Sequence, residues 1–250
     1  MTLSCCKCSG AGNTFILIDN REKTFPKPEI NLDHDIDGLI LLENSSIGDF
    51  RMRIFNRDGS EAEMCGNGLC CCVKFLEKIG EPKKKWRVET LGGIQFAWAN
   101  EEKVYVQMPS PQAMRWNLEV NIGQKSYLLH QLVVGVPHAI HFTEKIETVE
   151  INTLGKQLCH HPLFAPARTN VTFVSLSGDK SITIRTYERG VERETSACGT
   201  GAVAAALATA KLYAMPPEVA VTVRSGEKLK VCFTPNWEQV TLQGSVKFFE

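Results

Sequence analysis

Cys65 and Cys198 share a local sequence context that suits acid and base chemistry. Each stands immediately before a Gly-x-Gly turn, in CGNG at 65–68 and in CGTG at 198–201. A helix-forming run follows each turn, so we expect both thiols at a helix N-terminus, where unpaired N–H groups and the helix dipole favour negative charge. Such a position predicts a thiol pKa lowered from about 8.5 to roughly 3.5–7.5, and hence an effective base near neutral pH.

The glycines of the two motifs add a place for an anion. Without a β-carbon, Gly66 and Gly68, like Gly199 and Gly201, let a carboxylate approach the exposed amides. One such motif alone is more simply an ordinary helix start with a buried thiol, but two matched copies favour a shared function. If the two halves pack about a pseudo-twofold axis, one thiolate removes a proton from a carbon while the opposing thiol protonates its other face, and no cofactor is required.

The order of elements around each cysteine predicts a duplicated chain of the α+β class. The first copy reads as a strand, a helix stopped by a glycine and a three-stranded meander, at 51–55, 65–80, 86–90, 94–99 and 104–109. The second copy repeats this order with a helix stopped by two prolines, at 181–187, 198–214, 219–224, 228–233 and 239–244. We therefore expect two similar β-rich domains, 1–115 and 116–250, each wrapped around a central helix.

The overall composition points to a small-molecule partner. Lysine plus arginine and aspartate plus glutamate both number 28, so the formal net charge is zero and nothing favours nucleic acid or an anionic membrane surface. No apolar run has the length of a transmembrane helix, and the first ten residues do not resemble a secretory signal. We expect a cytoplasmic protein whose ten cysteines stay reduced.

Metal binding is the main alternative use for so many cysteines. Three groups supply ligand types: Cys5, Cys6 and Cys8; Cys70, Cys71 and Cys72; and CHH at 159–161. None has the spacing of a structural zinc site, because adjacent residues on a helix point in directions about 100° apart. The sequence therefore favours no metal and no cofactor. A non-catalytic metal-binding or redox-sensing protein remains as the rival class, and would show zinc-dependent folding.

Longer motifs make the chain resemble diaminopimelate epimerase. The resemblance is carried by MRIFNRDGSEAEMCGNG (52–68), ACGTGA (197–202), SGAGNTFILID (9–19), GVPH (135–138) and YERG (187–190). It implies an isomerase of the amino-acid racemase and epimerase type that uses no pyridoxal phosphate. The implied reaction interconverts LL- and meso-diaminopimelate, a step that supplies lysine and peptidoglycan precursors. It also implies two domains with the last few residues returning to the first, and we include a homodimer among the expectations.

The resemblance assigns roles to particular residues. Cys65 and Cys198 would be the acid and base pair, with His138 and Glu188 supporting them. The residues that would bind the substrate are Asn13, Asn56, Gly66, Asn67, Asn170, Glu188, Arg189, Gly199 and Thr200. Among these, Arg189 would clamp the distal carboxylate through two parallel hydrogen bonds. Taken singly, Asn13 suits a turn, His138 a buried core position and Glu188 with Arg189 a solvated ion pair.

Four departures from the family pattern bear on substrate choice. Val136 stands where the family has a substrate-contacting asparagine, and Cys70 stands where arginine is usual. The loop at 34–38 is shortened, and the segment 188–198 carries one extra residue and lacks a glycine. Loss of a polar partner is expected to reduce discrimination more than turnover. We therefore expect a broadened specificity, with racemisation of another amino acid such as glutamate as the alternative activity.

Overall fold

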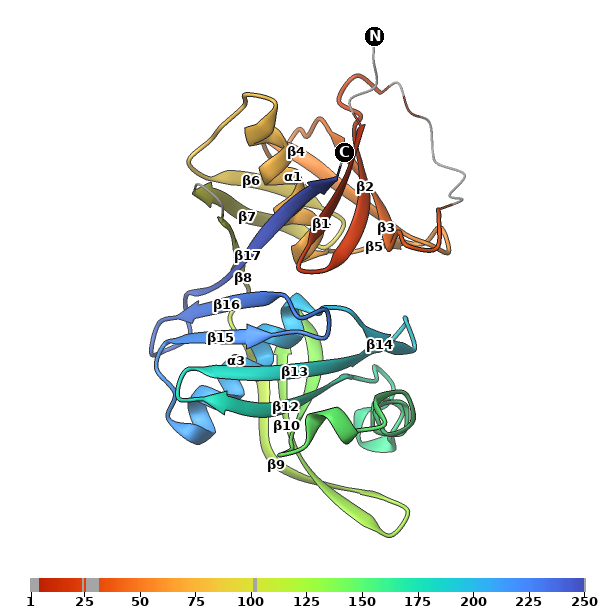
Figure 1. Ribbon diagram of the computed structural model, residues 1–250, viewed down its shortest axis with the longest axis vertical. Coiled ribbons are helices and arrows are strands. Elements are labelled where there is room, and N and C mark those ends of the chain that lie inside the picture. The colour runs from red at the N-terminus through yellow and green to blue at the C-terminus, as the bar shows by residue number, and fades with distance from the viewer. Residues whose placement is uncertain (1–4, 24, 26–31, 101–102, 250) are drawn as a thin grey trace. The chain divides into compact units, whose positions relative to one another are not determined.

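The computed structural model describes residues 5–23, 25, 32–100 and 103–249, and the chain forms two compact units (Figure 1). Unit 1 comprises Met1–Gln107 with Gln243–Glu250, and unit 2 comprises Met108–Leu242. The sequence predicted two duplicated segments, 1–115 and 116–250. These limits differ from those of the compact units, and the division into duplicated segments stays a proposal. Within the described ranges, every helix is too short or too polar to cross a lipid bilayer.

Unit 1 contains strands that close on themselves around one helix. Its strands are β1 (Cys5–Gly10), β2 (Asn13–Asp19), β3 (Gly38–Glu43), β4 (Phe50–Asn56), β5 (Glu61–Ala62), β6 (Trp86–Thr90), β7 (Gly93–Asn100), β8 (Lys103–Met108) and β17 (Val240–Phe249). Pairing runs β1–β2–β3–β4–β6–β7–β8–β17 and returns to β1, which makes an eight-stranded closed barrel. Closure leaves these strands without a free edge.

Helix α1 (Gly66–Lys78) contacts β1, β2, β4 and β7, strands spread around this ring, and therefore lies inside the barrel. The sequence explains the fit, because α1 is apolar over most of its length and is buried from Asn67 to Val73. The three adjacent cysteines 70–72 are part of this buried surface, where they act as small apolar side chains. The expected helix, stopped by Gly80, is confirmed.

Unit 2 wraps its strands around a second, more deeply buried helix. Its elements are β9 (Gln112–Ile122), β10 (Lys125–Val134), β11 (Val136–Phe142), η1 (Ile146–Thr148), η2 (Ile151–Gly155), α2 (Lys156–Cys159), η3 (Pro162–Phe164), β12 (Asn170–Gly178), β13 (Ser181–Glu188), β14 (Arg193–Thr195), α3 (Gly199–Tyr213), β15 (Glu218–Thr222) and β16 (Lys228–Phe233). Helix α3 contacts β10, β11, β12, β13, β15 and β16. Every residue from Gly201 to Thr209 is buried, and this alanine-rich segment has the small side chains that such enclosure requires.

The strand pairings confirm the repeated architecture. In unit 1 the pairs β1–β2, β2–β3, β3–β4, β4–β6 and β6–β7 run antiparallel, parallel, antiparallel, parallel and antiparallel. In unit 2 the pairs β10–β11, β11–β12, β12–β13, β13–β15 and β15–β16 follow the same sequence of directions. Each helix begins at the same point of this scheme. The fold is thus α+β, with two β-rich units each built around a central helix.

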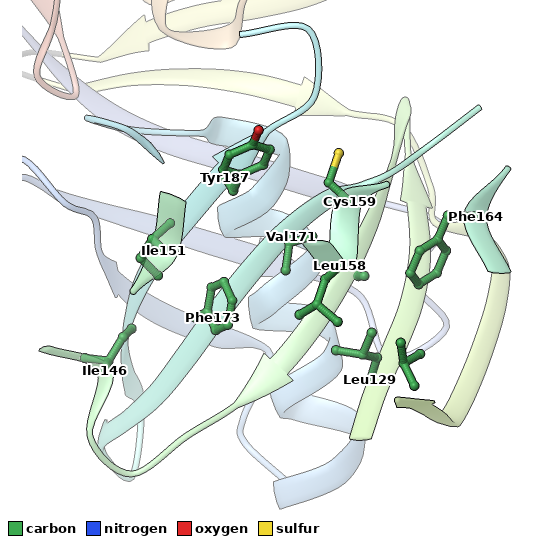
Figure 2. Packing of buried hydrophobic residues seen from close by; sticks show 11 residues of the cluster. Leu129, Ile146, Ile151, Leu158, Cys159, Phe164, Val171, Phe173 and Tyr187 are labelled. Carbon is green, nitrogen blue, oxygen red and sulfur yellow. The ribbon is translucent and has the colours of Figure 1, made fainter. Parts of the chain in front are cut away.

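A second apolar cluster supports unit 2 on the side away from α3. Figure 2 shows its members, among them Leu129, Leu158, Phe173 and Tyr187, which come from β10, α2, β12 and β13. Gly155 lies against Tyr187 so closely that a β-carbon there would stand 2.6 Å from the Tyr187 β-carbon. This packing fixes α2 and the end of β13, where Glu188 and the turn toward β14 begin.

We predict that Gly10→Ala destabilises unit 1 by about 1–3 kcal/mol, the range for overpacking a tight contact. A β-carbon at Gly10 would lie 2.6 Å from the Asn67 carbonyl oxygen and 3.3 Å from the Cys71 sulfur, at the start of α1. Ser9→Ala is the matched control, because successive residues of a strand point to opposite faces. Urea unfolding measures both variants, and equal midpoints would contradict the close approach of β1 to α1.

Candidate active site

Cys65 is the N-cap residue of α1. Its backbone is extended, with φ −141° and ψ 111°, and its Sγ accepts a hydrogen bond of 3.4 Å from the Gly68 N–H. The side chain is half-buried. Gly68 also packs tightly, since a β-carbon there would lie 3.1 Å from Ile40 and 3.2 Å from Ile54. The second glycine of this motif therefore has a packing role in addition to the expected opening toward an anion.

Three polar side chains gather beside the start of α1. Asn67 Nδ2 donates to Asn13 Oδ1 at 2.8 Å, and Asn13 Nδ2 donates to Asp37 Oδ2 at 3.4 Å. Asp37 Oδ2 also accepts from the Thr14 N–H at 2.9 Å. Two of the sequence-derived residues, Asn13 and Asn67, are thereby brought together and oriented. Asn67 is buried although polar, and its bond to Asn13 offsets the cost of that burial.

Asn56 lies apart from this chain of hydrogen bonds. It ends β4, is exposed, and its Nδ2 donates to Ser60 Oγ at 3.0 Å within its own turn. Its register partner on β3 is Gly38, the residue that follows Asp37. The backbone thus places Asn56 next to the Asn13 and Asp37 segment, while the side chain of Asn56 holds the turn.

Cys198 occupies the equivalent N-cap position of α3. Its backbone, with φ −129° and ψ 108°, closely matches that of Cys65, but its side chain makes no helix-capping hydrogen bond. Its Sγ lies 3.6 Å from Thr200 Oγ1. A β-carbon at Gly201 would lie 3.2 Å from this sulfur, so the second glycine of the motif makes room for the thiol. Cys198 is only 6% exposed.

The expected lowering of the thiol pKa is wrong for Cys198. Burial raises the pKa of the Cys198 thiol well above its usual range, and the negative charge of Glu188 raises it further. The helix N-terminus favours the thiolate, but removing the thiolate from water costs more here. Cys198 therefore carries its proton.

His138 joins this group from the neighbouring strand β11. It is fully buried, and its Nε2 lies 2.9 Å from Thr200 Oγ1. Its Nδ1 is buried and has no hydrogen-bond partner among the described residues. Burial, together with the charge of Arg189, lowers the pKa of His138 to about 3, so the imidazole is neutral at physiological pH.

Glu188 approaches Cys198 from the end of β13. Its Oε1 accepts a short hydrogen bond from Thr195 Oγ1, and its negative charge acts on the neighbouring Cys198 thiol. Burial raises the pKa of Glu188, although the Thr195 hydrogen bond and the Cys198 thiol lower it. Thr195 comes from β14, which pairs with β13 and so returns the chain to the Glu188 side chain just before Cys198.

Asn170 and Arg189 are linked directly. Asn170 Oδ1 accepts from the Arg189 N–H at 3.0 Å, and Arg189 Nη1 donates to the Ala167 carbonyl at 2.6 Å. Asn170 is also the register partner of His138, because β11 and β12 pair in parallel. Residues from three strands and from the α3 N-terminus therefore meet in unit 2. The structure brings together Cys198, Thr200, His138, Glu188, Asn170 and Arg189.

One group in the described part of the chain has ligand atoms close enough to hold a metal ion. It comprises Cys159, His160 and Glu192, whose ligand atoms all lie within 4.8 Å of one another. The Glu192 carboxylate already accepts four hydrogen bonds. The donors are Arg168 Nη1 at 2.8 Å, the Gly190 N–H at 2.9 Å, His160 Nε2 at 2.7 Å and Tyr187 Oη at 3.1 Å. The cationic Arg168 thus occupies the place that a metal would take, and Glu192 anchors the turn after Glu188.

The structure places the four features that the sequence resemblance marked as unusual. Val136 is half-buried at the start of β11, two residues before His138, and Cys70 is buried within α1. Burial raises the pKa of Cys70 to about 12, so its thiol is neutral. The loop at 34–38 supplies Asp37, which accepts a hydrogen bond from Asn13. The turn between β13 and β14 is held by Glu192, which accepts from the Gly190 N–H. Hydrogen bonds therefore fix both of these segments.

Sequence reasoning missed Asp37 and Thr195 as parts of the site. Asp37 lies in a loop interpreted from the sequence as lacking a binding side chain, yet it is the partner of Asn13. Thr195 lay within a segment interpreted only as a polar turn. Position in the sequence was the available signal. Asp37 is the polar residue directly before β3, and Thr195 is a polar residue three positions before Cys198.

The two β-rich units, each built around a central helix, share their fold with solved structures. A phenazine biosynthesis protein of the PhzF family from Enterococcus faecalis matches with a TM-score of 0.74 at 15% identity, covering 100% of this chain and 98% of its own. A probable proline racemase from Agrobacterium radiobacter matches with a TM-score of 0.71 at 18% identity, covering 99% and 91%. At these identities the likeness establishes the shared fold.

Sequence comparison narrows this fold class to one family. The diaminopimelate epimerase family profile matches residues 5–114 and 132–248. Diaminopimelate epimerase from Aquifex aeolicus is 38% identical over 98% of this chain and 95% of its own length. The protein of the same name from Chlorobaculum tepidum is 38% identical over 96% of each. The chain belongs to the diaminopimelate epimerase family.

The buried His138 predicts a specific loss of stability in acid. Its pKa is about 3 in the folded protein and 6.5 when unperturbed, so below pH 6.5 the unfolded chain takes up a proton that the folded chain refuses. The free energy of unfolding should then fall by up to about 1.4 kcal/mol per pH unit. The neutral variant His138→Gln lacks this contribution.

Urea unfolding of both proteins between pH 7.5 and pH 5 tests this expectation. The stability difference between wild type and His138→Gln should shift by about 2 kcal/mol in favour of the variant as the pH falls over that range. The raised pKa of Glu188 acts in the opposite direction but is present in both proteins and cancels in the comparison. A constant difference would contradict a buried neutral imidazole.

Proposed function

We propose that the protein is an isomerase that interconverts LL- and meso-diaminopimelate without a cofactor. The observation that carries this proposal is the pair of N-cap cysteines, which open two helices at equivalent points of two topologically equal units. Membership of the diaminopimelate epimerase family over nearly the whole chain supports diaminopimelate as the substrate. A small amino acid is the partner, and a cytoplasmic location and a homodimer belong to the same proposal.

In the proposed mechanism the two thiols act on opposite faces of one α-carbon. This mechanism requires Cys65 and Cys198 to face each other across the substrate, as they would if the two halves packed about a pseudo-twofold axis. One sulfur takes the α-proton and the other donates its own proton, which inverts the carbon. The amides of Gly66 and Asn67, and of Gly199 and Thr200, stabilise the negative charge that grows on the carboxylate.

The raised pKa of the Cys198 thiol suggests which cysteine acts as the acid in the first turnover. Cys198 carries its proton, as its raised pKa requires, and so acts as the acid. Cys65 then acts as the base, and the Gly68 N–H that it accepts at 3.4 Å stabilises the thiolate. In the reverse direction Cys198 must first lose its proton, and we assign that step to Glu188, whose carboxyl group acts on the thiol.

In this proposal the end of the substrate away from the reacting carbon is bound by the guanidinium group of Arg189 and by asparagine side chains. Arg189 is proposed to clamp the distal carboxylate, and Asn13, Asn56 and Asn170 bind the polar groups along the substrate. The Asn170 contact to the Arg189 N–H supports this assignment, because it places the two residues side by side. Among the described residues the Arg189 guanidinium bonds only Ala167, through Nη1, so we propose that Nε and Nη2 serve the ligand.

Substrate breadth follows from Val136. An aliphatic side chain cannot hydrogen-bond the second amino-acid group of diaminopimelate, so we propose loosened discrimination. Glutamate, a shorter acidic amino acid, is the alternative substrate. The rival class, a non-catalytic metal-binding or redox-sensing protein, is disfavoured at the group Cys159, His160 and Glu192, where Arg168 already occupies the carboxylate.

Incubation with LL-diaminopimelate in deuterium oxide tests the proposed function. Wild type should place deuterium at the α-carbon and form the meso isomer without added metal or cofactor, as mass spectrometry and NMR measure directly. Cys65→Ala and Cys198→Ala should each lose turnover by at least about 100-fold, the scale of a general acid or base contribution.

Cys232→Ala is the matched control, since Cys232 lies in β16, paired with Glu218 of β15, and belongs to neither Cys-Gly-x-Gly motif. It should retain wild-type turnover. A parallel assay with glutamate measures the range of substrates. Activity with diaminopimelate only would refute the proposed broad specificity but not the proposed reaction. Undiminished deuterium uptake in either helix-start variant would refute the two-thiol mechanism.

A further inference from the structure

The side chain of Glu192 is fixed by four donors although it lies at the surface of the turn between β13 and β14. Its Oε1 accepts from the Gly190 N–H at 2.9 Å and from Arg168 Nη1 at 2.8 Å. Its Oε2 lies 2.7 Å from His160 Nε2 and accepts from Tyr187 Oη at 3.1 Å. The Gly190 hydrogen bond is the main reason that the pKa of Glu192 falls to about 2, so the group is a carboxylate at neutral pH.

The backbone of Glu192 is unusual for a residue that carries a side chain. Its φ is 59°, in the left-handed region that favours glycine. Its N–H closes the turn by donating to the Glu188 carbonyl at 2.8 Å. Glycine would adopt this conformation at no steric cost. A side chain that is retained at such a position indicates a role for its contacts.

The turn that Glu192 holds is the one that carries Arg189. Glu192 binds the N–H of Gly190, the residue directly after Arg189. Through Arg168 it also binds the residue directly after Ala167, whose carbonyl accepts from Arg189 Nη1 at 2.6 Å. One carboxylate therefore links the backbone that bears Arg189 to the segment that anchors its guanidinium.

We propose that Glu192 is the positioning residue that orients Arg189 toward the distal carboxylate of the substrate. The inference rests on the proposed function, in which Arg189 binds the carboxylate that lies away from the reacting carbon. Glu192 itself does not contact the substrate, because both of its oxygens already have two donors each. It acts by holding the turn in one conformation. A guanidinium oriented in advance binds a carboxylate with a smaller loss of conformational entropy.

A purely structural role for Glu192 predicts a different result. Tyr187 belongs to the buried apolar cluster of unit 2, and disruption of that cluster would reduce the fraction of folded enzyme. The loss would appear in kcat and kcat/KM together, with KM unchanged. Loss of the Arg189 orientation instead weakens the binding of a group that takes no part in the reaction, so KM rises while kcat is retained.

Glu192→Ala tests the proposal, with Glu192→Gln as the matched control. Alanine has no acceptor, whereas glutamine keeps an oxygen for the Gly190 N–H. Glu192→Ala should raise KM for LL-diaminopimelate about tenfold or more and keep kcat within about threefold of wild type. Glu192→Gln should stay within about threefold of wild type in both constants. A wild-type KM in Glu192→Ala, or an equal rise of KM in both variants, would overturn the proposal.

A double-mutant cycle shows whether Glu192 acts through Arg189. Arg189→Met removes the guanidinium and should itself raise KM. The double variant Arg189→Met with Glu192→Ala should then have a KM within about twofold of Arg189→Met alone, because Glu192 has no guanidinium left to orient. Effects on KM that multiply in the double variant would contradict a role exerted through Arg189.

A further measurement does not depend on turnover. Arginine labelled with ¹⁵N reports the motion of the Arg189 Nε–H by the heteronuclear NOE, with Arg189→Lys to assign the signal. Without added substrate, the NOE should be high in wild type and in Glu192→Gln and lower in Glu192→Ala. Equal values in wild type and Glu192→Ala would overturn the proposal. Absence of turnover in wild type, with this difference in NOE present, would refute the proposed function alone.

Discussion

The position of a cysteine at the first unpaired turn of an enclosed helix is the constraint on which the structure depends. Cys65 and Cys198 are N-cap residues in extended conformation, and a helix surrounded by strands begins directly after each. A thiol on a loop could rotate away, but here the preceding strand and the following helix fix the direction of the Cα–Cβ bond. Gly68 and Gly201 both pack tightly next to these cysteines, since a β-carbon at either would lie 3.1 Å from its nearest neighbour. The barrel of unit 1 and the strands of unit 2 therefore serve to hold two sulfur atoms.

Duplication has preserved the backbone while the surroundings of the two thiols have diverged. Cys65 is half-buried and accepts an amide hydrogen bond, whereas Cys198 is buried beside a carboxylate. Neutral thiol and stabilised thiolate are the two states that a two-base reaction needs at its start. The contacts of Glu188, Thr195 and Thr200 around Cys198 differ from the contacts of Cys65. These side chains, and not the shared topology, therefore distinguish the two thiols.

The sequence predicted the architecture well because its signals are local. The strand alternation at 86–90, the glycine at 80 and the prolines at 216 and 217 each act within a few residues, and all marked real boundaries. The pKa of Cys198 could not be predicted, because its burial depends on β13, β14 and α3 together. Asp37 and Thr195 were missed for the same reason: their partners Asn13 and Glu188 lie in other strands, and only the assembled register brings them together.

The proposed placement of the two sulfur atoms on opposite faces of one carbon is the central claim. A crystal structure of the complex with diaminopimelate, collected from enzyme with both cysteines intact, tests it most directly. The account predicts the α-carbon between Cys65 Sγ and Cys198 Sγ, with each sulfur in contact with one face and the carboxylate at the first turns of α1 and α3. A substrate in contact with only one of the two sulfurs, or sulfurs that open into separate cavities, would contradict it.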